Sequence, residues 1–326
     1  MKPVSTPYPK IELHVHLEGT VRPDTLRAIA KRNDYALPDD LDAVYACRDI
    51  PHFAEVFMLT VGALTHYDDF RQIVVDYAAE ARAHGAVYLE AVFAPRLRHG
   101  FDSDAVFSGY CDGAQEALEL HGVEVRLTPD IPRVYTLEEA LTTAEYSVKY
   151  RDRGVVGLGL GGLPEEGFPP EPYAEAFAVA RAGGLGSVPH AGEAAGPDSI
   201  RGALEALHAD RIRHGIRAVE DPELVAELAA RGIVLDVCPI SNVLLGVVPS
   251  LEEHPLPQLV AAGVRCSIST DDPAIFATDL TREYEAAAAL GVSAQAAYEA
   301  GVAGALCDEE TRERLRQIGG AHDWDR

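Results

Sequence analysis

The sequence predicts an α/β protein that folds as one (β/α)8 TIM barrel, with extra helices after the first strand and at the C-terminus. Along its 326 residues, eight short β-rich runs alternate with helical stretches. Such alternation implies parallel strands joined by helical crossovers. The first run is not followed by the glycine-rich phosphate motif of a dinucleotide-binding sheet, and eight strand–helix units close into a barrel more readily than they form an open sheet.

The β-rich runs and several helices can be placed along the chain. The predicted strands begin near Ile11, Ala86, Val123, Val155, Gly186, Arg211, Ile233 and Arg265. Helices are predicted over Arg22–Asn33, Pro51–Leu64 and Asp68–His84, and in the tail from Asp279 to Arg326. Two further helices have legible end signals, because Thr136-x-x-Glu139 is a capping box and Asp221-Pro222 opens a helix that Gly232 closes.

The amino-acid composition argues against several classes of function. The formal net charge is −24, from 52 acidic and 28 basic residues, which argues against a nucleic-acid or polyphosphate groove because such a groove needs a basic stripe. Five cysteines without a C-x-x-C pair fit reduced thiols in a reducing cytoplasm. Residues 1–10 lack the apolar core of a signal peptide, and no apolar run reaches the roughly 20 residues of a membrane span. We therefore expect a cytoplasmic protein that binds neither nucleic acid nor membrane.

Two histidines end the first predicted strand. Apolar and polar residues alternate over residues 11–16, so His14 and His16 point to the same face, about 7 Å apart. Functional residues of (β/α)8 barrels gather at the carboxyl ends of the strands. At those ends the sequence places further histidines and carboxylates, namely His190, Glu193, His214, Asp271 and Asp272.

These residue types predict a metal site. Three histidines and one carboxylate form a nitrogen and oxygen ligand set that suits a catalytic zinc ion and leaves one position for water. A second metal would need a bridging ligand, and the predicted fourth strand, residues 155–162, contains no lysine that could supply one. We therefore predict one Zn²⁺ per chain.

We expect a single metal-dependent hydrolase barrel domain over residues 1–326, with a helical, lid-like insertion at about residues 38–66. Within this insertion Phe53, Val56, Phe57 and Thr60 recur at helical spacing. A stripe of this kind belongs most often to the core, but over an open site it can also form a lid.

Four motifs resemble those of the adenosine deaminase family of zinc aminohydrolases, and the likeness covers nearly the whole chain. They are His14-Val15-His16-Leu17-Glu18-Gly19, His190-Ala191-Gly192-Glu193, Arg213-His214-Gly215 and Ser269-Thr270-Asp271-Asp272-Pro273. The resemblance implies that the zinc ligands are His14, His16, His190 and Asp271. It makes Glu193 the proton donor to the purine N1, and it makes His214 the residue that orients or deprotonates the zinc water. Asp271 is thereby both ligand and catalytic residue.

The resemblance also implies a set of substrate contacts. Asp272 would meet the purine N7, a backbone group of Gly162 would meet N3, and His16 and Glu18 would lie against the substrate. The chemistry agrees, because zinc lowers the pKa of its water to about 7. Desolvation in a closed pocket would keep Glu193 protonated at neutral pH.

Three departures from the family pattern concern the substrate. Adenosine-specific members usually carry Asp at the position of Glu18, Gly at the position of Arg213, and Gly-Asp-Glu at residues 162–164. A longer carboxylate and a new guanidinium suggest altered handling of the part of the substrate beyond the base. The other interpretation of Arg213 is that it points into the helix layer.

Arginines after the second and third strands could bind an anionic substrate. Arg96, Arg98 and Arg133 fall at the ligand-binding end of the barrel, and a guanidinium holds a carboxylate through two parallel hydrogen bonds. The aryl carboxylate of 6-aminodeoxyfutalosine, a nucleoside of menaquinone synthesis, would fit such a clamp at Arg96 or Arg133. Alternatively, these arginines pair with nearby acids such as Glu90, Asp102 or Asp130.

The sequence thus predicts a zinc-dependent aminohydrolase that converts the 6-amino group of an adenine nucleoside to an oxo group and releases ammonia. The first candidates for this small-molecule purine substrate are 6-aminodeoxyfutalosine and adenosine or deoxyadenosine, and free adenine is an alternative. Two alternatives of other kinds are a catalytically inactive nucleoside-binding protein and a zinc hydrolase of esters or phosphotriesters. The intact Glu193 argues against both of these. The oligomeric state stays open.

Overall fold

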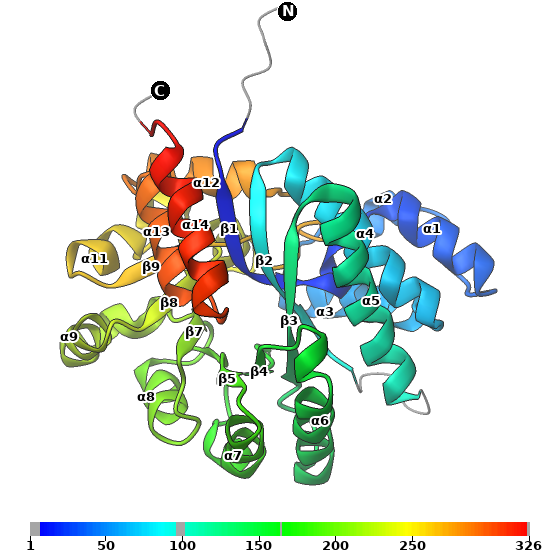
Figure 1. Cartoon of the computed structure of the whole chain (residues 1–326), viewed down its shortest axis with the longest axis horizontal. Helices are drawn as coiled ribbons and strands as arrows, with labels where there is room; N and C mark the ends of the chain where they lie inside the picture. Colours follow the sequence, from blue (N-terminus) through cyan, green and yellow to red (C-terminus); the bar gives the residue numbers. More distant parts are fainter. Residues whose placement is uncertain (1–6, 96–101, 164, 325–326) are drawn as a thin grey trace, which may run out of the picture.

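Parallel strands lie in the middle of the molecule and helices surround them (Figure 1). The computed structural model describes residues 7–95, 102–163 and 165–324. The strands are β1 (Lys10–His16), β2 (Ala86–Phe93), β3 (Glu124–Ile131), β4 (Gly157–Leu160), β5 (Gly186–Ser187), β6 (His190–Ala191), β7 (Arg211–His214), β8 (Val234–Val237) and β9 (Arg265–Ile268). They pair in the order β1-β2-β3-β4-β5 and β6-β7-β8-β9, and every pair is parallel.

The fifth predicted strand is divided into β5 and β6 around Pro189. Proline has no backbone N–H and therefore interrupts a hydrogen-bonded ladder. Pairing continues on both sides of the break, because Val188 N–H donates to Leu158 O (3.0 Å) and Arg213 N–H donates to Pro189 O (3.0 Å). The two short strands thus occupy one strand position in the barrel wall, which we call a stave. The barrel then has eight staves, as predicted.

The ring closes between the first and last strands. Val15 and Asp271 form a parallel bridge, in which His16 N–H donates to Asp271 O (2.8 Å) and Asp271 N–H donates to His14 O (3.1 Å). We call this contact the seam. It joins the two ends of the sheet order, and the predicted (β/α)8 barrel is confirmed.

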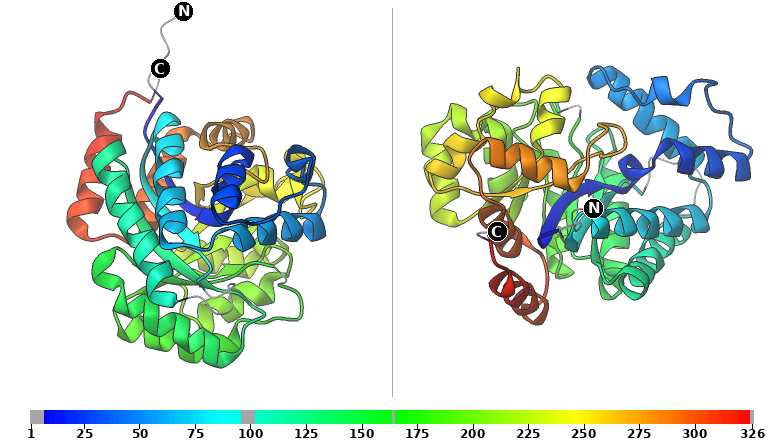
Figure 2. Two further views of the ribbon diagram at one scale, coloured as in Figure 1. Left: turned by 90° about the vertical axis from the view of Figure 1, so that its right-hand side faces the viewer. Right: turned by 90° about the horizontal axis from the view of Figure 1, so that it is seen from above.

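The helices follow the strands as crossovers, with additions at two places. They are α1 (Pro23–Arg32), α2 (Leu41–Val44), α3 (Ile50–Ala63), α4 (Tyr67–Ala83), α5 (Ser103–His121), α6 (Leu137–Lys149), α7 (Ala174–Ala182), α8 (Pro197–Glu205), α9 (Pro222–Arg231), α10 (Pro239–Leu244), α11 (Leu256–Ala261), α12 (Leu280–Ala289), α13 (Ala294–Gly304) and α14 (Glu309–Ala321). The extra helices α1 to α3 and the C-terminal α13 and α14 lie on opposite sides of the molecule (Figure 2). The predicted capping box at Thr136 and the predicted ends of α9 are present.

The alternation of β1 divides its side chains between two environments. Ile11 and Leu13 face outward into a small apolar cluster with α13 and α14. Helix α13 approaches closely, since a Cβ at Gly301 would lie 2.8 Å from Ile11. His14 and His16 alternate with these residues and therefore face the barrel interior.

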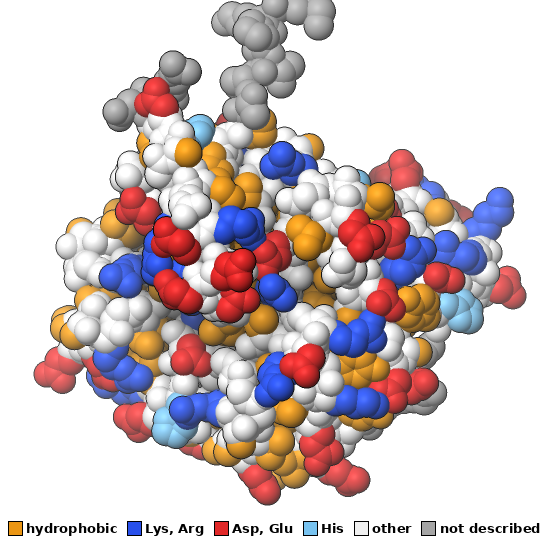
Figure 3. Space-filling view, in the orientation of Figure 1, with side chains coloured by type: hydrophobic (Ala, Val, Ile, Leu, Met, Phe, Trp, Pro, Cys, Tyr) orange, Lys and Arg blue, Asp and Glu red, His pale blue; other side chains and the backbone are white. Residues whose placement is uncertain are grey.

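One face of the molecule carries side chains of both charges. On the face shown in Figure 3, acidic and basic side chains are interspersed. None of the helices in the described ranges is long and apolar enough to cross a membrane.

A buried ion cluster, the floor cluster, joins three strands inside the barrel. It consists of Arg211, Glu90 and Asp236, which are all fully buried. Arg211 Nη2 lies 2.8 Å from Glu90 Oε2 and its Nε lies 2.5 Å from Asp236 Oδ2. The remaining guanidinium donors also reach the carbonyls of Leu13 and Gly304. One cation thus pairs with two carboxylates that have no access to water.

We expect Arg211→Met to lower the free energy of unfolding by about 3–5 kcal/mol, because it leaves two buried carboxylates without their counterion. Chemical denaturation followed by circular dichroism measures the loss. Arg231→Met is the control, since Arg231 pairs with Glu227 on the exposed face of α9 and such pairs contribute about 0–1 kcal/mol. Equal effects of the two substitutions would contradict a structural role for the floor cluster.

Candidate active site

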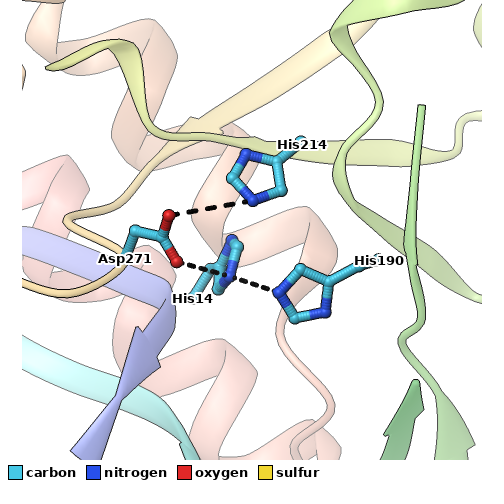
Figure 4. A group of neighbouring side chains, drawn as sticks. All are labelled: His14, His190, His214 and Asp271. Carbon is cyan, nitrogen blue, oxygen red and sulfur yellow. Dashed lines mark hydrogen bonds and ion pairs between the residues drawn. The ribbon is translucent and has the colours of Figure 1, made fainter. Parts of the chain in front are cut away.

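The predicted site residues come from four staves of the barrel. His14 and His16 end β1, His190 begins β6, His214 ends β7, and Asp271 follows β9. Because parallel strands in a closed barrel present their carboxyl ends at the same rim, these side chains converge. Figure 4 shows His14, His190 and His214 turned toward Asp271.

Four ligand atoms lie at distances that suit one metal ion. His14 Nε2 lies 3.3 Å from His16 Nε2, 3.0 Å from His190 Nε2 and 3.3 Å from Asp271 Oδ1. His16 Nε2 lies 3.2 Å from His190 Nε2 and 3.4 Å from Asp271 Oδ1. Zinc bonds of about 2.0–2.1 Å at tetrahedral angles place ligand atoms roughly 3.3 Å apart, so this set, which we call the ligand cluster, fits zinc. His214 also lies close enough to be grouped with His14, His190 and Asp271, but its Nε2 is 3.9 Å from Asp271 Oδ2.

The protonation states suit metal binding. Burial lowers the pKa of His16 to about 4 and that of His214 to about 3, so both rings are neutral near pH 7. His190 Nδ1 lies 2.8 Å from the carbonyl of Leu160, which makes it the protonated nitrogen and leaves the Nε2 lone pair for a metal. Ser241 Oγ donates to Asp271 Oδ2 (2.6 Å), and the other oxygen of Asp271 faces the histidines.

Arg213 supports His190 from inside the barrel. Its Nη1 donates to Asp130 Oδ1 and its Nη2 to Thr128 Oγ1 (2.6 Å). Asp130 Oδ2 in turn lies 3.4 Å from His190 Nδ1. Although burial opposes the charged form, Arg213 lowers the pKa of Asp130 to about 2. Arg213 is fully buried and is absent from the cavity lining. It therefore points into the barrel and not into the helix layer, and it does not line the cavity, which are the two positions considered from the sequence.

This ion pair requires a glycine on β4. A Cβ at Gly159 would lie 1.9 Å from Asp130 Oδ1 and 2.4 Å from Arg213 Nη1. The absence of a side chain on β4 thus provides the room in which Asp130 and Arg213 meet behind the ligand cluster.

Glu193 lies on the loop after β6 and is buried beside His214. Its Oε1 lies 3.6 Å from His214 Nε2. Burial, followed by the charges of Asp271 and Glu165, raises the pKa of Glu193 well above its usual range. A carboxyl group in this environment holds its proton at neutral pH, as required of a general acid.

The loop that carries Glu193 is held by one carboxylate, Glu165. Its two oxygens accept hydrogen bonds from the backbone N–H groups of residues 192–195, at 2.7, 3.1, 2.8 and 2.8 Å. Ser199 Oγ donates to it as well (2.5 Å). Five donors on one buried side chain fix the backbone at Glu193.

Two other predicted substrate contacts line the cavity. Gly162 packs so closely that a Cβ there would lie 3.0 Å from His190 Cδ2 and 3.2 Å from Glu193 Oε2. Asp272 has a buried Oδ1 with no hydrogen-bond partner among the described residues. Burial and the neighbouring Asp271 raise the pKa of Asp272 well above its usual range, which favours its neutral form, a hydrogen-bond donor.

The ligand cluster opens into a cavity of about 490 Å³. Helix α3 contributes Phe53, Phe57 and Met58 to the cavity lining, which also includes Val134 and Leu245. The predicted α3 stripe is therefore divided, because Phe53 and Phe57 line the cavity while Val56 and Thr60 are buried in the protein.

Two other predicted substrate contacts, Arg133 and Glu18, are absent from the cavity lining. Arg133 is buried and donates to the carbonyls of Gly161 (2.8 Å), Phe168 (2.5 Å) and His190 (2.6 Å). Its guanidinium is engaged with backbone and differs from the expected carboxylate clamp. Glu18 lies behind the wall, where its Oε1 accepts from Ala94 N–H (3.3 Å) and Tyr110 OH (3.1 Å). Arg96 and Arg98 lie outside the described residues.

Several supporting residues were missed from the sequence. Ser241 and Asn242 follow β8, and polar residues after a barrel strand were an available signal. Glu165 and His254 lie outside the regular strands and helices and had no recognisable pattern.

The barrel and the ligand cluster at its carboxyl rim define a metal-dependent hydrolase. A sequence model of the adenosine deaminase family matches residues 9–318. The chain therefore belongs to the adenosine deaminase family, which confirms the resemblance seen in its four motifs, and it is a hydrolytic deaminase.

The chain is similar to proteins with named activities and to solved structures. An aminodeoxyfutalosine deaminase of Acidothermus cellulolyticus is 50% identical over 329 residues, which cover 97% of this chain and 92% of that protein. The crystal structure of an adenine deaminase from Arthrobacter aurescens superposes with a TM-score of 0.90 at 28% identity, covering 96% of this chain and 98% of that one. An amidohydrolase from Burkholderia ambifaria with bound zinc has a TM-score of 0.89 at 29% identity, covering 98% and 91%.

We expect Asp130→Asn to weaken zinc binding about 10- to 100-fold, the usual effect of removing a carboxylate behind a metal-bound histidine. Competition with a chromophoric chelator measures the dissociation constant, and circular dichroism verifies that the variant is folded. The matched control is Asp112→Asn, which removes an acid from an exposed pair with Arg153. An unchanged zinc affinity in a folded Asp130→Asn protein would contradict this role.

Proposed function

We propose that this protein is a zinc-dependent aminohydrolase that replaces the 6-amino group of 6-aminodeoxyfutalosine by an oxo group, with one zinc ion per chain. The observation that carries the reaction is the convergence of the ligand cluster and the protonated Glu193 in one cavity. The 50% identity to an aminodeoxyfutalosine deaminase supports the choice of substrate.

His14, His16, His190 and Asp271 would hold the ion. Bound there, zinc would lower the pKa of water and supply hydroxide at neutral pH. The protein's own residues perform the other tasks. Glu193 gives its proton to the purine N1 while hydroxide adds to C6. The added oxygen then passes a proton to the amino group, the C6–N bond breaks, and ammonia leaves.

The purine is oriented by groups that complement its nitrogen atoms. N7 is an acceptor, and Asp272 can donate to it because its pKa is raised. The Gly162 backbone lies against His190 and Glu193 and would meet N3. With N1 directed to Glu193, these contacts fix the ring plane over the ligand cluster.

The cavity mouth supports a substrate with an apolar extension. Met58 and Val134 line the cavity although 46% and 62% of their surfaces are exposed. Phe53 and Phe57 stand beside them on α3. An aryl group on the 5′ side of the nucleoside would bury these side chains, whereas free adenine would leave them in water. We propose that the α3 segment serves as the lid over this group.

Free adenine is the second candidate, favoured by the close superposition on an adenine deaminase structure.

We also propose that the protein is located in the cytoplasm. All five cysteines are unpaired, which fits a reducing compartment.

We expect ammonia release from a panel of 6-aminopurines to be most efficient with 6-aminodeoxyfutalosine, because it alone fills the apolar mouth. Adenosine, deoxyadenosine and adenine are the comparisons, and kcat/KM is the measure. Phe57→Ala should raise KM for the aryl nucleoside more than for adenosine. A higher kcat/KM for adenine would transfer the assignment to the second candidate.

We expect Glu193→Gln to retain zinc and to lose about 10²–10⁴-fold in kcat, because an amide cannot deliver the proton. Since the acid must be protonated, wild-type activity should fall as pH rises through the raised pKa of Glu193. Elemental analysis checks the metal. A loss smaller than tenfold would show that another group protonates the ring.

A further inference from the structure

A line of buried hydrogen bonds leads away from His214 on the side opposite the cavity. His214 Nδ1 lies 3.1 Å from Asn242 Nδ2. Asn242 Oδ1 lies 3.2 Å from His254 Nε2, and His254 Nδ1 lies 3.1 Å from the backbone nitrogen of Leu256. His214, Asn242 and His254 are at most 2% exposed. Asn242 belongs to α10, His254 follows the short helix Leu251–Glu253, and Leu256 begins α11.

The contact between His254 and Leu256 determines which group donates and which accepts in each of these hydrogen bonds. A backbone N–H can only donate, so His254 Nδ1 must accept from Leu256 and cannot carry a proton. Burial lowers the pKa of His254 to about 4, so the ring is neutral and its proton is on Nε2. His254 therefore donates to Asn242 Oδ1. The amide nitrogen of Asn242 is then the group that faces His214.

This order determines the proton position on His214. Its Nδ1 accepts from the Asn242 amide, so the single proton of the neutral ring lies on Nε2. That nitrogen faces the cavity, where its neighbours are Glu193 Oε1 at 3.6 Å and Asp271 Oδ2 at 3.9 Å. An N–H group directed at the Asp271 carboxylate is favourable, whereas a lone pair at the same place would be repelled by that negative charge.

We propose that Asn242 and His254 are positioning residues that hold His214 as its Nε2–H tautomer, so that His214 donates a hydrogen bond to the reacting oxygen and does not serve as its general base. The inference rests on the proposed deamination and decides between orienting and deprotonating the water. In this role His214 gains and loses no proton during the reaction.

A base at His214 would need the opposite arrangement. Its Nε2 would have to present a lone pair, and its Nδ1 would carry the proton toward the amide of Asn242. Turning that amide around would direct its NH2 group at the Nε2–H of His254. A buried donor left without an acceptor is unfavourable, so the protein opposes the base form at two successive contacts.

The test is the tautomer of His214 in the zinc-loaded protein, read by long-range ¹H–¹⁵N NMR on protein labelled with ¹⁵N-histidine. The His214 signals are assigned by their loss in His214→Gln. We expect a protonated Nε2 and an unprotonated Nδ1 in both His214 and His254. A spectrum with the His214 proton on Nδ1 would overturn the proposal.

A variant should reverse the tautomer. In Asn242→Asp a carboxylate oxygen replaces the amide nitrogen, so the His214 proton should move to Nδ1, and the donor in the cavity is lost. We expect kcat to fall about 10²–10³-fold, the usual effect of removing one donor to a developing oxyanion, with zinc content and KM little changed. If this variant does not fold, His254→Leu releases the Asn242 amide and should give a mixture of both tautomers.

The outcomes separate this inference from the proposed function. Wild-type deamination with the proton on Nδ1, or a reversed tautomer with unchanged kcat, rejects the positioning role alone. Failure to release ammonia from any 6-aminopurine rejects the proposed function, whatever the spectrum shows.

Discussion

The seam between β1 and the residue after β9 is the contact on which the rest of the structure depends. Its two backbone hydrogen bonds close the barrel, and they also bring Asp271 beside His14 and His16. Asp271 adopts a left-handed backbone conformation (φ 64°), as does His214 (φ 59°). This conformation is unfavourable for residues other than glycine and persists only where the surroundings impose it. Closure of the barrel therefore also brings together three of the four residues of the ligand cluster.

Buried charges that bind backbone groups hold the loops of the site. Glu165 collects the N–H groups around Glu193, and Arg133 collects the carbonyls of Gly161, Phe168 and His190. Backbone groups in a loop have no ladder partners, and burying them unpaired is costly. A single carboxylate or guanidinium satisfies several at once. These hydrogen bonds restrain the loops and thereby help to fix the positions of the proton donor and the ligands.

The sequence was sufficient to predict the barrel and its eight staves, because hydrophobic periodicity is a local pattern. The particular residues of the ligand cluster came from the resemblance of its motifs to the adenosine deaminase family. It could not show which way the interior arginines point. Arg133 and Arg213 stand at the correct rim for a substrate clamp, yet both guanidinium groups bind protein atoms. The direction in which each arginine points depends on residues that are distant in the sequence. Gly159, for example, leaves the space in which Asp130 meets Arg213. Asn242 and His254 are joined to His214 by hydrogen bonds that the spacing of residues along the sequence does not predict.

The seam also has a consequence for the newly synthesised chain. It joins residues at opposite ends of the sequence: near it, His14 N–H donates to Ser269 Oγ across 255 residues. While the ribosome is still making the later strands, β1 can pair with β2 on one side only. An unpaired strand edge is a template for association with other chains. Emergence of β9 therefore ends an aggregation-prone interval of synthesis, and molecular chaperones would be most needed before that moment.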